Sequence, residues 1–544
     1  MLRLPTLTLL LLTAVPGFGQ MAARTLPLLD GLPTGLAVIP DFDGDGRPDL
    51  VLGSPDYSPN WSMFSRGRIR FQSSATGLSG GEITGSQNYA KFGAHVIQLG
   101  DVNGDGVPDF AFSQDSPVRL HIFSGASRTH LRSDSFPSVL SCVAATSDLD
   151  QDGVPDYVVG MRSYIANGTA RVMFVSGATG AVRLEITAPT GHSSLGAAVA
   201  EVDDLDGDGV PDFALGLPTV GQGGLNWVGQ VNLVSGATGS LIRALIPLTP
   251  QSYYQYGSAL AVPGDINGDG VRDLVICGTS RFVAVSGATG SLLYARTLLP
   301  VALWDTEVRA ARVGDLNFDG LDELLVWGRS FSDQPGATSQ LVYKIVDGAT
   351  GDISVPFSIS ESFGSYNQSW LGAGDIDGDG RPELVAPYMV NPARLFILSF
   401  PLTLGVCEGL PNSTGSAGAL AITGSVSLGA STARLEATGL PALATTFFLA
   451  SRTFGAATPV QGSQGALCLT GPIGRFVGPG QVQTSDAAGR ASLALDPAAL
   501  PTPTGLTSAT VGERWSFQAW HRDSTLGGAA TSNFTGARLA WIQP

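Results

Sequence analysis

One nine-residue pattern, D-x-[DN]-x-D-G-x-x-[DE], occurs seven times in this chain, and no other feature constrains the fold as strongly. Successive copies begin 47 to 61 residues apart. A segment of that length holds about four short strands with their turns, which is the content of one β-propeller blade. The copies begin at Asp41, Asp101, Asp148, Asp204, Asp265, Asp315 and Asp375. The pattern therefore predicts a seven-bladed β-propeller.

The segments around each copy also repeat. An apolar stretch such as 94–100 precedes the motif and another such as 110–113 follows it, which predicts two strands joined by the motif loop. A third apolar stretch ends in "SGATG" or a close variant, and its last glycine is expected to supply a positive φ. These glycines are Gly180, Gly239, Gly290 and Gly351.

The ends of the repeat region bear on whether the propeller closes. The last copy ends with an apolar stretch over 394–400, so all seven repeats look complete. Residues 26–40 are expected to supply a strand to the final blade, which would leave few sheet edges exposed. An open solenoid is the alternative, but neither end shows an obvious polar cap, so the closed ring is favoured.

Composition supports an all-β chain with more than one domain. The 544 residues include 71 glycines and 34 prolines, which suits short strands joined by tight turns. This length exceeds what a single hydrophobic core usually fills. The motif is absent after about residue 404, where alanine, glycine, serine and threonine become frequent. We expect a propeller over residues 21–403 and a β-sandwich-like domain over 404–544.

The motif has the donor pattern of a calcium site. Positions one, three, five and nine carry side-chain oxygens, position seven offers a backbone carbonyl, and glycine at position six permits a sharp turn. Substitutions to Asn at position three and to Glu at position nine keep an oxygen donor, and no copy contains His or Cys. The sequence predicts up to seven Ca²⁺ ions, one per repeat. The expected ligands are Asp41, Asp43, Asp45, Arg47, Asp49, Asp101, Asn103, Asp105, Val107, Asp109, Asp148, Asp150, Asp152, Val154, Asp156, Asp204, Asp206, Asp208, Val210, Asp212, Asp265, Asn267, Asp269, Val271, Asp273, Asp315, Asn317, Asp319, Leu321, Glu323, Asp375, Asp377, Asp379, Arg381 and Glu383.

Charge supports metal binding, although a solvated acidic turn is the alternative for any single loop. More than half of the 46 acidic residues stand at motif positions, where they would repel one another without a cation. Seven Ca²⁺ ions would carry +14 and nearly cancel the net charge of −16. The ions are expected to brace the loops rather than to signal. Positions outside the ligand set are expected to vary freely, and Gln151 and Phe318 at position four mark two loops expected to be altered.

Net charge and the N-terminal segment bear on location and partners. A charge of −16 disfavours nucleic acid and anionic membranes as partners. Arg3, an apolar run from Leu7 to Val15 and a small-residue segment after it predict a signal peptide over residues 1–20, cleaved near Gly19 or Gln20. The apolar run is too short to span a bilayer, so a secreted or cell-surface protein without a transmembrane segment is expected.

Export would permit disulfides, and the four cysteines are widely separated. Cys407 and Cys468 share the C-terminal region and are the candidate pair. Cys142 and Cys277 lie in apolar, strand-like segments and are expected to be buried thiols. No CxxC pair is present, which disfavours a zinc or redox site.

The repeats resemble the FG-GAP family, found in the propellers of integrin α-subunit heads and of many secreted bacterial proteins. The Phe-Gly element is visible as Phe92-Gly93 and, in altered form, as Leu195-Gly196 and Tyr256-Gly257. A looser Gly-Ala-Pro element appears as Gly53-Ser54-Pro55 and Gly216-Leu217-Pro218. The resemblance covers about residues 26–400 and implies a calcium-binding propeller of the integrin α type, with adhesion or ligand binding on one face. Because all seven loops match the motif, the chain looks most like the bacterial members.

The C-terminal region alternates apolar and small or polar residues, which predicts six to eight strands. It resembles a module found at the end of secreted bacterial repeat proteins. Trp515, Phe517, Trp520 and Trp541 would form either a sugar-binding platform or part of a core, and alternating aromatics in a strand favour the core.

The function predicted from the sequence is ligand binding or adhesion rather than catalysis. None of the five histidines stands in a nucleophile or metalloprotease motif, and no phosphate-binding loop is present, so the chain is expected not to be an enzyme. Loops 54–64 and 251–257 are rich in aromatic residues and are candidates for binding an extracellular protein or polysaccharide. The chain is expected to be monomeric. A structural matrix or surface-layer component and a carbohydrate-active enzyme are the alternatives.

Overall fold

A computed structural model of the chain contains two compact units. The first comprises chiefly residues 23–314 and 321–399, and the second chiefly residues 400–544. The structure describes residues 22–27, 33–59, 64–161, 169–189, 193–298, 308–315, 321–330, 340–359, 371–376, 383–388, 394–399, 403–407, 409–429, 431–511, 513–524 and 529–542. The expected signal peptide, residues 1–20, lies outside the described residues.

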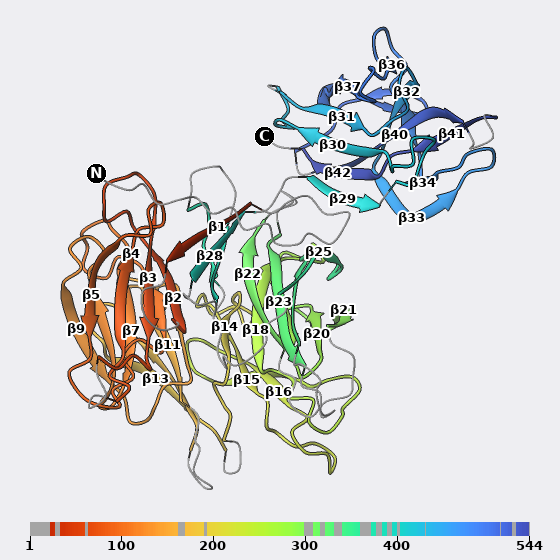
Figure 1. The fold of residues 1–544 in the computed structure, drawn as a ribbon. Coiled ribbons are helices and arrows are strands. Elements are labelled where there is room, and N and C mark those ends of the chain that lie inside the picture. The colour runs from red at the N-terminus through yellow and green to blue at the C-terminus, as the bar shows by residue number, and fades with distance from the viewer. Residues whose placement is uncertain are drawn as a thin grey trace, which may run out of the picture. The chain divides into compact units, whose positions relative to one another are not determined.

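The first unit contains seven four-stranded sheets, each holding one copy of the repeat. Figure 1 shows strands of these sheets lying side by side. The first four sheets, in chain order, are β2 (Gly35–Ile39), β3 (Asp49–Ser54), β4 (Arg68–Gln72) and β5 (Ser79–Thr84); β6 (Val96–Gln98), β7 (Phe110–Asp115), β8 (Val118–Phe123) and β9 (His130–Ser135); β10 (Cys142–Ala145), β11 (Tyr157–Met161), β12 (Arg171–Val175) and β13 (Val182–Thr187); and β14 (Val199–Glu201), β15 (Phe213–Leu217), β16 (Gln230–Val234) and β17 (Leu241–Leu245).

The other three sheets keep the same strand order, except that the fourth strand of the last sheet is β1 from the N-terminal end. They are β18 (Ala259–Gly264), β19 (Asp273–Cys277), β20 (Arg281–Val285) and β21 (Leu292–Thr297); β22 (Val308–Gly314), β23 (Glu323–Ser330), β24 (Gln340–Val346) and β25 (Ile353–Ile359); and β26 (Leu371–Gly372), β27 (Glu383–Tyr388), β28 (Arg394–Ser399) and β1 (Ala22–Pro27). The predicted all-β, propeller-type fold is confirmed.

The chain closes the ring with its own N-terminal strand. β1 pairs with β28 as the fourth strand of the last sheet. Leu26 on β1 and Leu36 and Leu52 of the first sheet share one apolar cluster with Val385 and Ile397 of the last sheet. The strand expected from residues 26–40 is therefore contributed by residues 22–27, and Gly35–Ile39 instead begins the first sheet. Closure covers two edges that an open solenoid would expose.

The core of this unit lies between neighbouring sheets. Central strands such as β3, β11 and β15 are buried along their whole length, because each sheet has another packed on both of its faces. Fourth strands such as β5 are mostly exposed. The first strands contact one another in the order β2, β6, β10, β14, β18, β22 and β26. A cavity of about 460 Å³ is lined by residues of β2, β6, β10 and β26 and by their neighbours.

Glycine pairs allow neighbouring sheets to approach closely. A Cβ added at Gly53 would lie 2.1 Å from the carbonyl oxygen of Gly93 in the next repeat. The same relationship joins Gly160 to Gly196 and Gly216 to Gly257, at 2.2 and 2.1 Å. Gly93, Gly196 and Gly257 are the glycines of the Phe-Gly element, and Gly53 and Gly216 begin the Gly-Ala-Pro element. The two elements therefore meet across two of these three sheet boundaries, and at the third Gly160 takes the place of the Gly-Ala-Pro glycine.

The third-strand turns behave as the sequence predicts. Gly180, Gly239, Gly290 and Gly351 have φ between 69° and 75°. Each of their N–H groups donates to the carbonyl of the residue four positions earlier, as from Gly180 to Ser176 at 2.8 Å. A side chain with a Cβ is strained at such a φ, which explains the glycine at this position.

The second unit is also built of strands. Its main sheet contains β29 (Thr403–Cys407), β42 (Ala537–Trp541), β40 (Arg514–Ser524), β32 (Thr445–Ser451), β35 (Gly474–Arg475), β36 (Gln483–Thr484) and β41 (Ala530–Phe534). A second sheet contains β30 (Ala419–Thr423), β31 (Arg434–Thr438) and β37 (Ala491–Ala494). Two hairpins, β33 (Thr453–Pro459) with β34 (Ala466–Thr470) and β38 (Leu500–Thr502) with β39 (Gly505–Thr507), and the 3₁₀ turn η1 (Pro497–Ala499) complete the described elements.

The two larger sheets of this unit share one apolar core. Leu420 and Leu435 from the smaller sheet cluster with Phe448, Trp515 and Phe517 from the larger one. Trp515 and Phe517 are at most 1% exposed, so they belong to the core and not to a sugar-binding platform. The unit contains fourteen described strands instead of the six to eight expected, because several short hairpins lack the alternating pattern that identifies longer strands.

The cysteines differ between the two units. Cys468 is disulfide-bonded. Cys277 is a buried thiol and Cys142 a half-buried one, and neither is bonded into a disulfide. The remaining cysteine of the chain is Cys407, the predicted partner of Cys468, whose side chain lies outside the described residues. None of the described segments forms a helix with the length and apolar character needed to cross a bilayer.

Candidate metal centres

Each nine-residue motif forms the connection between the first and second strands of its sheet, as the sequence predicts. The first five loops are described completely. Of the expected ligands in the sixth and seventh loops, the structure describes Asp315, Leu321, Glu323, Asp375 and Glu383. The expected ligands Asn317, Asp319, Asp377, Asp379 and Arg381 lie outside the described residues.

The aspartate at position one organises the loop backbone. In the first loop, Asp41 Oδ1 accepts the N–H of Gly44 at 2.6 Å and Asp41 Oδ2 accepts the N–H of Gly46 at 2.7 Å. The hydrogen bond from Gly46 is the main cause that holds the pKa of Asp41 below its usual value. Equivalent bonds are made by Asp101, Asp204 and Asp265. The backbone amides thus turn the position-one carboxylate toward the loop.

Position five orients the backbone of position seven. Asp45 Oδ1 accepts the N–H of Arg47 at 2.9 Å. The same bond recurs in the next four loops, from Val107, Val154, Val210 and Val271. One oxygen of the position-five carboxylate is therefore used to hold the turn. In the second, fourth and fifth loops the other oxygen accepts the hydroxyl of Ser124, Ser235 or Ser286 at 3.2 to 3.4 Å.

Position four is more restricted than the sequence argument expected. Its glycines Gly44, Gly104, Gly207 and Gly268 have φ between 75° and 81°, in the left-handed region. Gln151 adopts φ 59° at the same place, which is strained for a residue with a Cβ. In that loop the position-one oxygen accepts from Asp152 at 3.2 Å. The expectation that positions outside the ligand set vary freely is wrong here, because the turn itself selects glycine.

Position nine has a structural role that sequence reasoning missed. The side chain of Asp49 is fully buried. Its Oδ2 accepts the N–H of Phe42 at 2.9 Å, and its Oδ1 accepts the N–H of Ser74 at 2.9 Å. The carboxylate thus joins the motif loop to the turn after the third strand. Burial raises the pKa of Asp49, and the two amide hydrogen bonds oppose that shift.

The same bridge recurs in the next four sheets, always to the glycine of the "SG" turn. The position-nine oxygens accept from Gly125, Gly177, Gly236 and Gly287 at 2.7 to 3.0 Å. All seven position-nine side chains are at most 1% exposed. The only sequence signal for this role was that acids at position nine occur together with the "SGATG" turn in most repeats.

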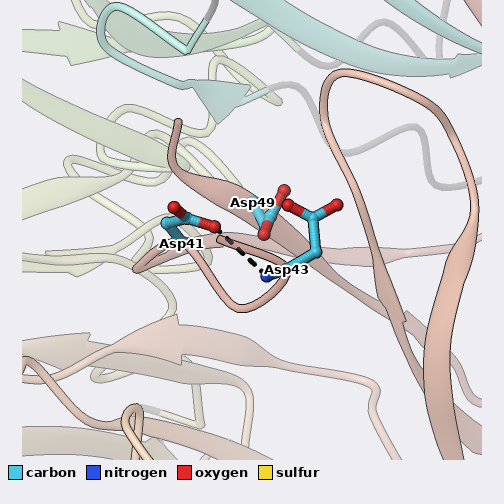
Figure 2. A group of neighbouring side chains, drawn as sticks. All are labelled: Asp41, Asp43 and Asp49. Carbon is cyan, nitrogen blue, oxygen red and sulfur yellow. Dashed lines mark hydrogen bonds between the residues drawn. The ribbon is translucent and has the colours of Figure 1, made fainter. Parts of the chain in front are cut away.

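Carboxylates of three loops converge closely enough to share a cation. Ligand atoms of Asp41, Asp43 and Asp49 all lie within 4.8 Å of one another, and Figure 2 shows the three side chains gathered at one loop. Two further groups have the same property: Asp148, Asp150 and Asp156, and Asp204, Asp206 and Asp212. The structure therefore brings together positions one, three and nine of the first, third and fourth loops.

The second and fifth loops have Asn at position three. Asn103 Oδ1 accepts the N–H of Asp105 at 2.9 Å, and its Nδ2 donates to Asp105 Oδ2 at 2.9 Å. That contact lowers the pKa of Asp105. The amide oxygen takes the place of a carboxylate oxygen, so these loops carry one formal charge fewer.

The donor chemistry of the described loops fits a hard cation. Every side-chain ligand atom expected at positions one, three, five and nine is an oxygen, although some of these oxygens, such as Asp41 Oδ1, already accept several backbone amides. Calcium accepts six to eight oxygens in flexible geometry, whereas magnesium requires a near-ideal octahedron. A loop of carboxylates and one carbonyl suits calcium better.

Comparison with known proteins identifies the repeats. Residues 41–112, which span the first motif loop and the second repeat as far as β7, match the FG-GAP-like repeat family. The chain carries FG-GAP-like repeats. The matched region includes the Phe92-Gly93 element, whose glycine packs against Gly53. Membership of a bacterial subgroup stays a prediction.

Relatives of two kinds contain similar segments. Phosphatidylinositol-glycan-specific phospholipase D of Rattus norvegicus is 34% identical over 263 residues, which cover 43% of this chain and 29% of the relative. Integrin alpha-D of Homo sapiens is 28% identical over 151 residues, covering 23% of this chain and 12% of the relative. Integrin alpha-IIb of Homo sapiens is 28% identical over 154 residues, covering 24% and 15%. The matches thus span less than a third of each relative.

The phospholipase relatives contradict the expectation that this chain is not an enzyme. That expectation rested on the absence of recognisable catalytic motifs. FG-GAP-like repeats are themselves non-catalytic, yet here they match part of a named enzyme. The absence of a catalytic motif from the repeats therefore does not exclude catalysis, because the catalytic residues of a protein can lie outside its propeller blades.

Proposed function

We propose that this chain is a secreted β-propeller whose loops bind calcium and whose surface binds an extracellular ligand. The observation that carries the proposal is the convergence of positions one, three and nine in three loops, with ligand atoms within 4.8 Å. The similarity to integrin α subunits supports a ligand-binding or adhesion role. The proposed ligand is a protein or polysaccharide, and a matrix or surface-layer component remains the structural alternative.

Calcium would bind loops whose conformation is already held by hydrogen bonds within the protein. Position one holds the turn, position nine holds the loop to its sheet, and the position-seven carbonyl is oriented by position five. In the first five loops, which the structure describes completely, no ion pair compensates the negative charge that these groups bring together. The proposed ions would compensate this charge, with the sites running from the Asp41 loop to the Asp375 loop.

The proposal places the chain outside the cell after cleavage near Gly19 or Gln20. The two compact units agree with a propeller followed by a separate C-terminal domain, which we propose as residues 21–403 and 404–544. The disulfide at Cys468 is compatible with an oxidising compartment. The C-terminal domain has no assigned activity.

Thermal melting of the full chain in calcium and in chelator tests the metal sites. A site held at 100 times its Kd stabilises the fold by about 2.7 kcal/mol, so several sites would raise Tm clearly. Asp43→Ala, which removes a side chain with one weak hydrogen bond of 3.3 Å, is expected to reduce the calcium-dependent gain. Asp352→Ala, at an exposed ion pair outside the motif, is the matched control. Identical melts in calcium and chelator would refute the proposal.

The phospholipase relatives favour a second candidate, in which the propeller serves a lipid-cleaving enzyme. Incubating the full chain with a phosphatidylinositol-glycan-anchored protein and measuring release of the soluble protein tests this directly. Release would show catalysis by this chain. Binding of the anchored protein without release would assign the propeller a recognition role.

A further inference from the structure

An apolar pocket lies between the fourth and fifth sheets, away from the motif loops. Its volume is about 430 Å³, within the range of small-ligand pockets. Leu245, Tyr256, Val283 and Val285 form its buried wall, each less than 10% exposed. None of the lining residues belongs to a nine-residue motif, so the pocket is independent of the proposed calcium function.

The rim of the pocket carries three apolar side chains that are exposed to solvent. Leu248 is 77% exposed, Ile246 is 49% exposed and Leu292 is 44% exposed. All three side chains line the same opening. A cluster of exposed apolar side chains beside a pocket is typical of a site that an apolar ligand covers.

The charged residues lining the pocket are both basic. Arg243 and Arg281 line it, and no acidic residue does, although acids outnumber bases 46 to 30 in the chain. Arg243 donates to the carbonyl of Ala288 at 2.9 Å, which holds its stem along the pocket wall. The guanidinium of Arg281 forms no ion pair within the described part of the chain. The charge of this pocket is therefore complementary to an anion.

Comparison of the sheets explains why Arg281 lacks an acidic neighbour. Arg68 in the first sheet and Arg171 in the third occupy the same register as Arg281, each opposite a threonine of the fourth strand. Arg68 pairs with Glu82 at 3.3 Å, and Arg171 pairs with Glu185 at 2.6 Å.

In the fifth sheet the residue at the glutamate position is Ala295. It lies opposite Val283, as Glu185 lies opposite Met173 in the third sheet. Ala295 is exposed and lines the pocket. The cation of the repeat is thus kept beside an apolar pocket while its internal anion is absent. In the second sheet Arg119 also lacks this anion, because Ser133 stands at the glutamate position.

We propose that this pocket binds a single-chain amphiphile with an anionic head group. The head group, a carboxylate or a phosphate, would replace the missing glutamate and meet Arg281, with Arg243 beside it. The hydrocarbon chain would cover Ile246, Leu248 and Leu292 and enter the space against Leu245 and Tyr256. Burial of each methylene raises affinity about fourfold, so a chain of several carbons would give measurable affinity.

Calorimetric titration of the full chain, after gel filtration to remove excess divalent ions, tests the proposal. The probes are decanoate and decyl phosphate, with decanol and decyltrimethylammonium as neutral and cationic controls, all as monomers. At least one anionic probe is expected to bind one-to-one and about tenfold or more tightly than either control. Binding by only one anion identifies the head group. Equal binding of decanol and both anions would overturn the proposal.

Four variants test whether the anionic probes bind in this pocket. Ala295→Glu restores the ion pair of the first and third sheets and is expected to weaken anion binding about tenfold or more. Arg281→Gln should do the same, whereas Arg171→Gln, the matched change in the third sheet, should not. Leu248→Ser, at an exposed rim position, provides a second test if Ala295→Glu lowers Tm. Unchanged affinity in Ala295→Glu and Leu248→Ser would refute the assignment.

Discussion

The carboxylate of Asp49 accepts a hydrogen bond from the backbone N–H of Ser74 at 2.9 Å, across 25 residues of chain. Its other oxygen accepts from Phe42 in the motif loop. The two contacts fasten the motif loop to the turn after the third strand of its own sheet. Position nine is therefore a structural acid, whether or not it also contacts a cation.

Asp49→Asn is expected to destabilise the protein even without metal. An amide at this position can accept one backbone N–H but places its own NH₂ group against the other, which leaves buried donors unsatisfied at a cost of about 1–3 kcal/mol. Urea denaturation in excess chelator measures the loss. Asp43→Asn, on an exposed side chain of the same loop, is the control and should cost much less. Equal costs for both variants would contradict a structural role for Asp49.

Gln151→Gly is expected to stabilise the third loop. The residue adopts φ 59°, where a Cβ costs roughly 1–2 kcal/mol and glycine costs only its greater freedom in the unfolded chain. A net gain of about 0.5–1 kcal/mol should follow, seen as a higher urea midpoint. Asn103→Gly, at a position without positive φ, should give no gain. A loss of stability in Gln151→Gly would show that the glutamine side chain has a role of its own.

Gly53→Ala is expected to disrupt packing between the first two sheets. The added methyl would lie 2.1 Å from the Gly93 carbonyl oxygen, so two backbones must separate, at a cost of about 3 kcal/mol or more. Gly81→Ala is the control: its φ of 127° imposes backbone strain, but no atom lies within 4 Å of the new methyl. Melting of both variants in calcium separates steric from conformational cost. Similar Tm values would argue against a tight contact between sheets.

Protonation of His521 is expected to destabilise the C-terminal unit in mild acid. The ring is fully buried, and neither nitrogen has a hydrogen-bond partner among the described residues. Burial lowers the pKa of His521 to about 4, although the nearby Asp523 carboxylate opposes the shift. Between pH 6.5 and about 4 the unfolded chain therefore binds more protons than the folded one, and stability falls as pH falls.

His521→Leu should remove this dependence. Between pH 4 and 6.5 the free energy of unfolding of the variant is expected to depend less steeply on pH than that of the parent chain. The difference in slope is up to about 1.4 kcal/mol per pH unit. Leu506→Ser, at an exposed position of the same unit, is the control and should leave the slope unchanged. A parent and His521→Leu variant with equal slopes would show that His521 does not titrate in this range.

The sheets, motif loops and glycine turns of this protein can be predicted from the sequence, because each depends on residues close together in the chain and recurs from repeat to repeat. The spacing of the motif predicts one sheet per repeat, and glycine at Gly180 and its equivalents predicts the left-handed turn that the structure contains. Asp41 and Asp43 stand two residues apart, so a tight turn alone brings their carboxylate oxygens together. Such features depend on neighbours in the chain and can be found without a fold.

The remaining features depend on contacts between distant segments, which only the tertiary structure decides. Asp49 reaches Ser74 because the second and third strands pair, and Gly53 reaches Gly93 because consecutive sheets pack face to face. β1 closes the ring through pairing with a strand more than 360 residues later. Ala295 leaves Arg281 without an acid only in the register that the sheet imposes. The sequence predicts that the ring closes but places the closing strand within residues 26–40, because pairing and burial across such distances cannot be read from neighbouring residues.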